Sequence, residues 1–285
     1  MPYVNLKDIL AGSRENGYAV GAFNFNSYED CQGMVDGAVA KNAPLILMAS
    51  MAAVRYVGLK TMVYMVKGMA ESVEIPVCLH LDHATDLDFI KSCIDAGFSS
   101  VMIDASMKTY EENIKSSHHI VQYAKQAGCS VEAELGMLGG REENIVVNSA
   151  SACFTTPEDV PYFVRETGVD ALAIAFGTAH GFYKETPKLD FQRVRDIAAV
   201  TTVPLVMHGG TGVSENDFRT AIVCGISKIN VGTELKKTYV DAVREAVYAN
   251  PTEEDPRKYM KIVKERCSQV VKEKIDIFGS TDKAR

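Results

Sequence analysis

The feature of this sequence that most limits its fold is an eightfold alternation of short apolar runs with longer amphipathic stretches. The runs are rich in Val, Ile and Leu and are continuous, as expected of strands buried on both faces of a parallel sheet. The strands are expected at 18–23, 44–49, 76–81, 98–103, 130–135, 170–176, 204–208 and 226–231. The fifth differs from the others, because Glu132 and Glu134 place two carboxylates on one alternating face.

Helical periodicity fills the intervals between these runs. Apolar residues recur at helical spacing from Cys31 to Val39, and Ser27 stands before them as an N-cap. Ser214 has the same place before a helix at 215–224. The other helices are expected at 59–73, 86–96, 109–127, 157–167, 190–201, 233–249 and 256–277.

Eight strand-then-helix units in a chain of 285 residues predict an α/β fold, a single (β/α)8 TIM barrel with an additional C-terminal helix. The sequence contains no repeat or linker that would divide it, so residues 1–285 are expected to form one catalytic domain. A doubly wound open sheet is the alternative architecture. The longest connection without helical periodicity, at about 136–156, predicts a lid, a binding loop or a disordered segment.

Composition excludes several classes of protein. Apolar residues make up 47% and charged residues 24%, which is typical of a globular chain. The net charge of −7 disfavours nucleic acid as a partner, and no apolar run reaches the roughly 20 residues of a membrane helix. The seven cysteines are scattered and never form a CxxC pair, so a disulfide framework is not expected. No signal peptide is recognisable, which favours a cytoplasmic location.

Polar side chains stand at the end of every expected strand. In a (β/α)8 barrel the active site lies at the carboxyl ends of the strands. Small apolar residues would serve the fold equally well there, so the pattern indicates a function. The sixth strand is taken to run on to His180. The residues are Asn24, Ser50, Asp82 with His83, Asp104, Glu134, His180, His208 and Asn230.

Three of these strand-end residues are the histidines His83, His180 and His208, which would converge on the barrel mouth. Three imidazoles with an open fourth position are the usual ligand set of a catalytic zinc. Asp104 and Glu134 could supply carboxylate oxygens to the same ion or to a second one. The sequence therefore predicts a metal centre at the mouth.

Two carboxylates are candidates for proton transfer. Asp82 adjoins a predicted metal ligand and could act as an acid and base coupled to the metal; alternatively it orients His80 or a lysine. His80 itself is expected inside the barrel, behind the site. Glu142 lies beside Glu143 in the long connection, so it is either part of a solvated charge pair or a group brought in by loop closure.

Two glycine-containing loops predict a phosphate site. HGGTG at 208–212 follows the seventh strand, and NVGTEL at 230–235 ends the eighth. Loops at these two places form the recurrent phosphate site of TIM barrels. Glycine lets backbone N–H groups approach an anion, and the following helix N-terminus adds a favourable dipole.

The chain resembles the class II, metal-dependent ketose-bisphosphate aldolases, in the shorter branch that includes fructose-bisphosphate and tagatose-bisphosphate aldolases. The matching segments span nearly the whole chain in the same order. They are GYAVGAFN at 17–24, HLDHATD at 80–86, SVMIDAS at 100–106, VEAELGMLGG at 131–140, GTAHGFY at 177–183, LVMHGGTG at 205–212, KINVGTEL at 228–235 and DPRKY at 255–259.

The resemblance implies reversible aldol cleavage of a ketose 1,6-bisphosphate, of the fructose or tagatose type, to dihydroxyacetone phosphate and an aldehyde phosphate. His83, His180 and His208 would hold one catalytic Zn²⁺, which would stabilise the enediolate. Asp104 and Glu134 would serve an alternative or second metal position. The resemblance also allows a monovalent cation as a further cofactor.

The resemblance assigns the remaining roles residue by residue. Asp82 would exchange a proton with the C4 hydroxyl, and Glu142 would move the proton at C3. Arg257 would reach the distal phosphate, within its own subunit or across a boundary in a homodimer or homotetramer. The residues expected to bind the ketose half and its phosphate are Gly181, Gly209, Gly210, Thr211, Asn230, Val231, Gly232 and Thr233, assisted by Asn24, Ser50 and Lys184.

The sequence departs from the family pattern at Ala84, at Arg141 and Glu143 in the lid, and at Met51 and Val54. No catalytic group is lost, so these departures bear on the aldehyde that is accepted. Four alternatives stay open: an aldolase for another phosphorylated ketose or a deoxy-keto acid phosphate, a zinc hydrolase, a non-catalytic barrel partner, and a Schiff-base aldolase. The last would use Lys228, the only lysine in an expected strand.

Overall fold

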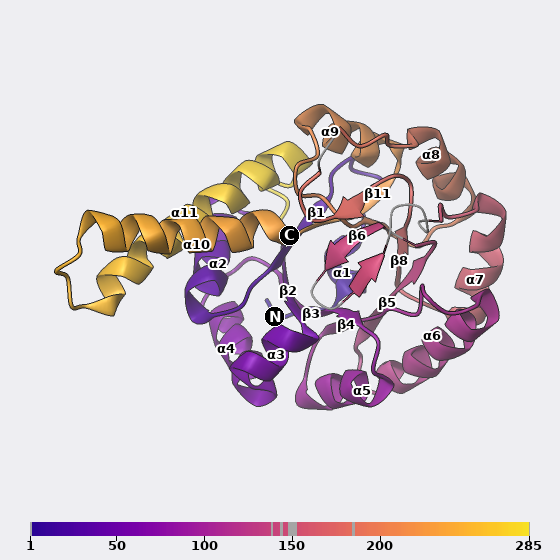
Figure 1. Cartoon of the computed structure of the whole chain (residues 1–285). Helices are drawn as coiled ribbons and strands as arrows, with labels where there is room; N and C mark the ends of the chain where they lie inside the picture. The colour runs from indigo at the N-terminus through magenta and orange to yellow at the C-terminus, as the bar shows by residue number, and fades with distance from the viewer. Residues whose placement is uncertain (1, 138, 143–144, 148–152, 184–185, 285) are drawn as a thin grey trace.

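The computed structural model describes residues 2–137, 139–142, 145–147, 153–183 and 186–284, with the backbone alone at 139–142 and 145–147. Eight parallel strands close into a barrel, which confirms the predicted TIM fold (Figure 1). In barrel order they are β1 (Val20–Asn24), β11 (Ile226–Val231), β10 (Leu205–Met207), β8 (Ala171–Ile174), β5 (Ser130–Leu135), β4 (Ser100–Ile103), β3 (Val77–Ala84) and β2 (Leu45–Ser50).

Helices surround the barrel, one after each strand. They are α2 (Tyr28–Ala40), α4 (Leu59–Glu71), α5 (Leu87–Ala96), α6 (Tyr110–Lys125), α7 (Val160–Thr167), α8 (Phe191–Val200), α9 (Glu215–Cys224) and α10 (Thr233–Ala249). The predicted C-terminal helix is α11 (Pro256–Phe278), which packs on α2 and α10. Ser27 and Ser214 cap α2 and α9 as predicted.

Two helices and one small sheet were not predicted. α1 (Leu6–Leu10) and α3 (Met51–Val57) are too short to show a periodic pattern. In the long connection, β6 (Gly139–Glu142) and β7 (Ile145–Val147) form a hairpin, and β9 (Ala179–His180) pairs with β6. A 3-10 turn at Pro157–Asp159 precedes α7.

The sixth strand is shorter than predicted. β8 ends at Ile174 rather than running on to His180. Gly177 has φ +113°, which breaks the extended backbone, and Ala179–His180 then pairs with β6 outside the barrel sheet. His180 therefore belongs to the small sheet over the barrel mouth.

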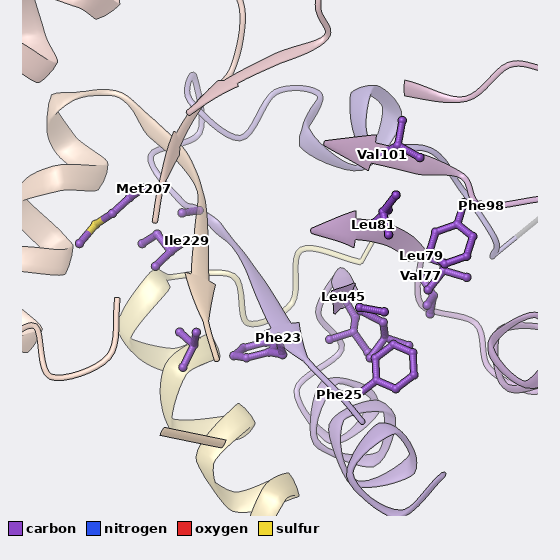
Figure 2. Packing of buried hydrophobic residues seen from close by; sticks show 14 of the residues in the cluster. Phe23, Phe25, Leu45, Val77, Leu79, Leu81, Phe98, Val101, Met207 and Ile229 are labelled. Atoms are coloured by element: carbon purple, nitrogen blue, oxygen red, sulfur yellow. The ribbon is translucent and has the colours of Figure 1, made fainter. Parts of the chain in front are cut away.

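Most of the apolar core lies between the strands and the surrounding helices. Phe23, Leu45 and Leu79 point outward from their strands into this layer (Figure 2). A smaller cluster fills the lower barrel interior, where Leu6 and Leu10 of α1 close the bottom. The core thus leaves the opposite end of the barrel for polar side chains.

Period-2 alternation fixes which side chains enter the barrel. On β3, for example, Cys78 lies in the apolar cluster, His80 above it, and Asp82 at the mouth. The mouth layer holds Asn24, Ser50, Asp82, Asp104, Glu134, His208 and Asn230. The strand register therefore gathers the predicted strand-end residues in one place, as the sequence indicated.

Within the part of the chain that the structure describes, no helix has both the length and the apolarity needed to cross a bilayer. All seven cysteines are free, and six of them are buried, which agrees with the absence of a disulfide framework. Cys153 is the exposed one.

Candidate metal centre and phosphate pocket

An irregularity in β3 brings two adjacent residues to the barrel mouth. Consecutive residues of a regular strand point to opposite faces, so Asp82 and His83 could not both face inward. The β3–β4 register shifts between Leu81 and Ala84, and His83 has φ +45°. A bulge of this kind re-aims one side chain, and such strain persists where the surrounding structure enforces it. Asp82 and His83 both end up buried at the mouth.

The three predicted histidine ligands form one cluster. His83 Nε2 and His208 Nδ1 lie 2.7 Å apart, and the ring centroids of His83 and His180 are 4.8 Å apart. His83 is also grouped with Asp104 and Glu134; within each of these two triads the ligand atoms lie within 4.8 Å of one another. The structure thus brings together all five residues that the sequence singled out for metal binding.

Carboxylates hold the far side of two of these imidazoles. Asp104 Oδ2 lies 2.9 Å from His83 Nδ1, and Glu132 Oε1 lies 2.8 Å from His208 Nε2. A carboxylate partner fixes the N–H on the nitrogen that it contacts. The nitrogens that face each other, His83 Nε2 and His208 Nδ1, are then both lone-pair donors. Two lone pairs that face each other repel unless a cation lies between them, so the donor set fits a metal such as zinc.

Burial and charge shift the ionisation of this cluster. Burial lowers the pKa of His208, which favours the neutral imidazole that a metal requires. Burial alone would raise the pKa of the Asp104 and Glu132 carboxyls. At Asp104 the contacts with His83 and Ser106 together outweigh burial, and at Glu132 the contacts with Lys228, His208 and His80 together do so. Both pKa values therefore lie below their usual range.

The Asp82 carboxylate is held by two amides. Asn24 Nδ2 donates to Asp82 Oδ2 at 2.8 Å, and Asn230 Nδ2 approaches Asp82 Oδ1 at 3.4 Å. Asp82 is only 2% exposed. The carboxylate is thus fixed beside the histidine cluster, in the place that the sequence predicted for an acid and base.

His80 lies one layer deeper, as predicted. Its Nδ1 is 2.8 Å from Ser100 Oγ, and its Nε2 has no hydrogen-bond partner among the described residues. Burial, reinforced by the charge of Lys228, lowers the pKa of His80 to about 3. His80 is therefore a neutral imidazole behind the site.

A pocket of about 70 Å³ adjoins the histidine cluster. Gly209 and Gly210 line it from the first glycine loop, and Thr233 from the second. Thr211 Oγ1 accepts a hydrogen bond from Glu234 N at 3.2 Å, which ties the two loops together. The complete lining is Asn24, His180, Gly181, Gly209, Gly210, Thr211, Asn230, Gly232, Thr233 and Lys236. Eight of the predicted substrate-binding residues thus meet in one cavity.

The other predicted substrate-binding residues and Glu142 are not among the described residues that line this pocket. Ser50 caps α3, with its Oγ accepting from Ala53 N, and Val231 is packed in the outer core. Glu142 lies in β6, where only the backbone is described, and Lys184 lies outside the described residues. Arg257 begins α11, far along a helical hairpin that projects from the barrel, and pairs with Asp255 at 2.8 Å (Figure 1).

Three residues at the site received no role from the sequence. Lys236 lines the pocket from the first turn of α10, a place that the lysines after NVGTEL could have indicated. Tyr183 accepts from Ala179 N at 2.9 Å and donates to Gly209 O at 2.8 Å, which joins β9 to the first glycine loop. In the sequence Glu132 is only a polar exception in its strand, yet in the structure its carboxylate contacts His208.

The geometry combines a metal-type cluster, a fixed carboxylate and a phosphate-sized pocket. A family model described as class-II fructose-bisphosphate aldolase matches residues 4–283. The chain belongs to this family. As a member it is an aldolase, a lyase of carbohydrate metabolism, and the family implies a divalent metal.

Relatives support this membership over the whole chain. The fructose-bisphosphate aldolases of Staphylococcus epidermidis and Staphylococcus aureus are each 43% identical over the full length of both proteins. Among solved structures, the YdjI aldolase from Escherichia coli K12 is 31% identical with a TM-score of 0.87, covering 99% of this chain and 100% of that one. A putative fructose-1,6-biphosphate aldolase from Coccidioides immitis is 29% identical with a TM-score of 0.91, covering 98% of each.

Proposed function

We propose that this class II aldolase reversibly cleaves a ketose 1,6-bisphosphate, of the fructose or tagatose type, to dihydroxyacetone phosphate and an aldehyde phosphate. The observation that carries the proposal is the fixed Asp82 carboxylate beside the histidine cluster, whose two amide partners, Asn24 and Asn230, line the glycine-containing pocket. Cleavage of such a sugar needs an electrophile at the C2 ketone, a base at the C4 hydroxyl and an anchor for the phosphate. The histidine cluster with its metal, Asp82 and the pocket would meet these three needs.

His83, His180 and His208 would hold the zinc ion, and Asp104 and Glu134 are the candidate ligands of an alternative or second position. When bound, zinc supplies Lewis-acid stabilisation of the negative charge that develops beside the ketone. The chain's own contribution is to orient the imidazoles. Asp104 contacts Nδ1 of His83 and Glu132 contacts Nε2 of His208, which leaves the other nitrogen of each ring for the metal.

Asp82 would take the proton of the C4 hydroxyl as the C3–C4 bond breaks and return it in condensation. Asn24 and Asn230, which both line the pocket, hold its two oxygens in place, so little reorganisation is needed. Such acid–base steps are typically worth ~10²–10⁴-fold in rate. Glu142, on the hairpin whose β6 strand pairs with His180, is the residue we assign to the proton at C3.

Gly209, Gly210 and Thr233 would bind the phosphate of the ketose half at the N-terminus of α10. Binding this remote group orients the sugar and contributes to lowering the barrier. The fully buried Lys228, whose ammonium contacts Glu132 and Asn230, offers no free amine for a Schiff base. Arg257 would bind the distal phosphate of a neighbouring subunit in a homodimer or homotetramer, and the cytoplasm is the expected location.

The test is the release of triose phosphate from fructose 1,6-bisphosphate, with tagatose 1,6-bisphosphate run alongside. We expect release that a chelator abolishes and that added zinc restores. The ratio of the two rates gives the sugar preference. A zinc-loaded protein that cleaves neither bisphosphate would contradict the proposal, and borohydride trapping of substrate on Lys228 would contradict the metal-dependent mechanism.

A further inference from the structure

A fully buried ion pair lies directly beneath the histidine cluster. Lys228 Nζ is 2.9 Å from Glu132 Oε2, and neither side chain is exposed. Replacing a buried ion pair by apolar residues of similar volume is often neutral or stabilising. Interior positions around it, such as Met48 and Val206, are apolar. The fold alone therefore does not account for two opposite charges at this depth.

Each member of the pair makes a second contact toward the site. Glu132 Oε1 is 2.8 Å from Nε2 of His208, and Lys228 Nζ is 2.8 Å from Oδ1 of Asn230. An ammonium group only donates, so the Asn230 atom that faces it must be the oxygen. The Asn230 amide nitrogen is thereby turned to the site, where Nδ2 lies 3.4 Å from Asp82 Oδ1 and 3.3 Å from His208 Nε2.

We propose that Lys228 and Glu132 form a positioning pair that couples the orientation of His208 to that of Asn230. Glu132 fixes which His208 nitrogen faces the metal position, and Lys228 fixes which face of the Asn230 amide meets Asp82. The pair thus links the metal centre to the proton-transferring carboxylate through two side chains that touch neither substrate nor metal. The proposal rests on the proposed function, since it takes His208 as a zinc ligand and Asp82 as the acid and base.

Two single variants test the two contacts of the pair separately, Glu132 with His208 and Lys228 with Asn230. Glu132→Gln replaces the charged acceptor of His208, so zinc binding should weaken by about 10–100-fold, as is typical when such an outer partner is lost. Lys228→Met leaves Glu132 in contact with His208 but releases Asn230. At saturating zinc its kcat should fall by about 10–100-fold, with a smaller change in KM, because the phosphate pocket is intact.

The double variant Glu132→Gln/Lys228→Met distinguishes positioning from mere charge compensation. Each single variant leaves one buried charge without its partner, which destabilises the fold, whereas the double variant removes both charges. If the pair positions the site, the double variant recovers thermal stability but keeps the weak zinc binding and the low kcat. Full recovery of zinc affinity and kcat would overturn the proposal.

The measurements are the zinc dissociation constant by competition with a chelating dye, kcat and KM, and thermal unfolding of the metal-free protein. Lys41→Met is the matched control, because Lys41 pairs with Asp276 at 2.6 Å beyond the end of α2, away from the mouth. It should leave zinc affinity and kcat unchanged. Folded single variants with wild-type zinc affinity and wild-type kcat would also overturn the proposal. The zinc measurement needs no substrate, so it tests the His208 contact even if the wild-type protein cleaves neither sugar.

Discussion

The two amides that hold Asp82 make a prediction about a single residue. Asp82→Asn keeps the shape of the side chain but removes its ability to take a proton. We expect kcat for the bisphosphate to fall by roughly 10²–10⁴-fold, the usual contribution of a general acid–base group. Zinc stoichiometry should be unchanged, because Asp82 is not one of the clustered ligands. Loss of zinc together with activity would instead indicate that Asp82 maintains the metal centre.

His80 predicts a pH dependence of stability. Its pKa is lowered to about 3, from 6.5, by burial and by Lys228. Below pH 6.5 the unfolded chain binds a proton here that the folded chain does not, so the contribution of His80 is complete above pH 6.5 and is lost as the pH falls toward 3. The loss is up to about 1.4 kcal/mol per pH unit.

The measurement compares metal-free wild type with His80→Asn in urea unfolding from pH 8 to pH 5. The difference in unfolding free energy between the two proteins should be constant above pH 6.5 and should shrink below it, because only the wild type loses this contribution. Parallel curves down to pH 5 would show that His80 does not titrate as its burial indicates.

Individual residues differ in how far the sequence could place them. The mouth residues could be predicted, because strand ends converge in any barrel and the barrel does not require a polar side chain at every strand end. The contact between Glu132 and His208 could not, since it depends on the register of β5 against strands far away in the chain. The positive φ of His83 could not be predicted from the sequence either, because no glycine or turn residue marks the bulge.

At the scale of elements, β9 lies so close to the first glycine loop that a methyl group added to this loop should displace it. Gly209 has φ +69°, and a Cβ there would collide with the carbonyl oxygen of Ala179. Gly209→Ala should therefore displace β9, which carries His180. We expect weaker zinc binding and a higher KM for the bisphosphate, together with a lower melting temperature.

Gly128→Ala is the control for this variant. Gly128 has a similar φ of +66° in the turn before β5, but nothing lies within 4 Å of its would-be Cβ. It should cost only the backbone strain of about 1–2 kcal/mol and leave zinc binding and KM unchanged. If both variants are less stable but both bind zinc as the wild type does, the contact with Ala179 has no part in holding the metal centre.

The barrel elements were predictable because each buried strand and each amphipathic helix carries its own periodic pattern. β6, β7 and β9 were not, because their pairing joins two loops rather than continuing a local pattern. The overextended sixth strand has the same cause. His180 lies in an extended segment near the mouth, as the sequence suggested, but its backbone partner is β6.

At the scale of the whole molecule, α10 and the beginning of α11 extend away from the barrel as a helical hairpin (Figure 1). Arg257 stands at the far end of this hairpin, with its side chain 89% exposed and its guanidinium paired with Asp255. The beginning of α11 thus stands away from the barrel that carries it (Figure 1). We therefore expect Arg257 to serve the active site of another copy of the chain.

This expectation can be tested by complementation between two damaged subunits. Arg257→Ala should raise KM for the bisphosphate, and Asp82→Asn should lower turnover in its own barrel by roughly 10²–10⁴-fold. In an oligomer that contains one subunit of each kind, the Arg257→Ala barrel keeps Asp82 and receives Arg257 from its neighbour. Oligomers purified through two different tags should therefore regain the wild-type KM at their competent sites. If Arg257 acts within its own subunit, every site in such an oligomer lacks one of the two groups, and the mixed oligomers will keep the high KM of the Arg257→Ala protein.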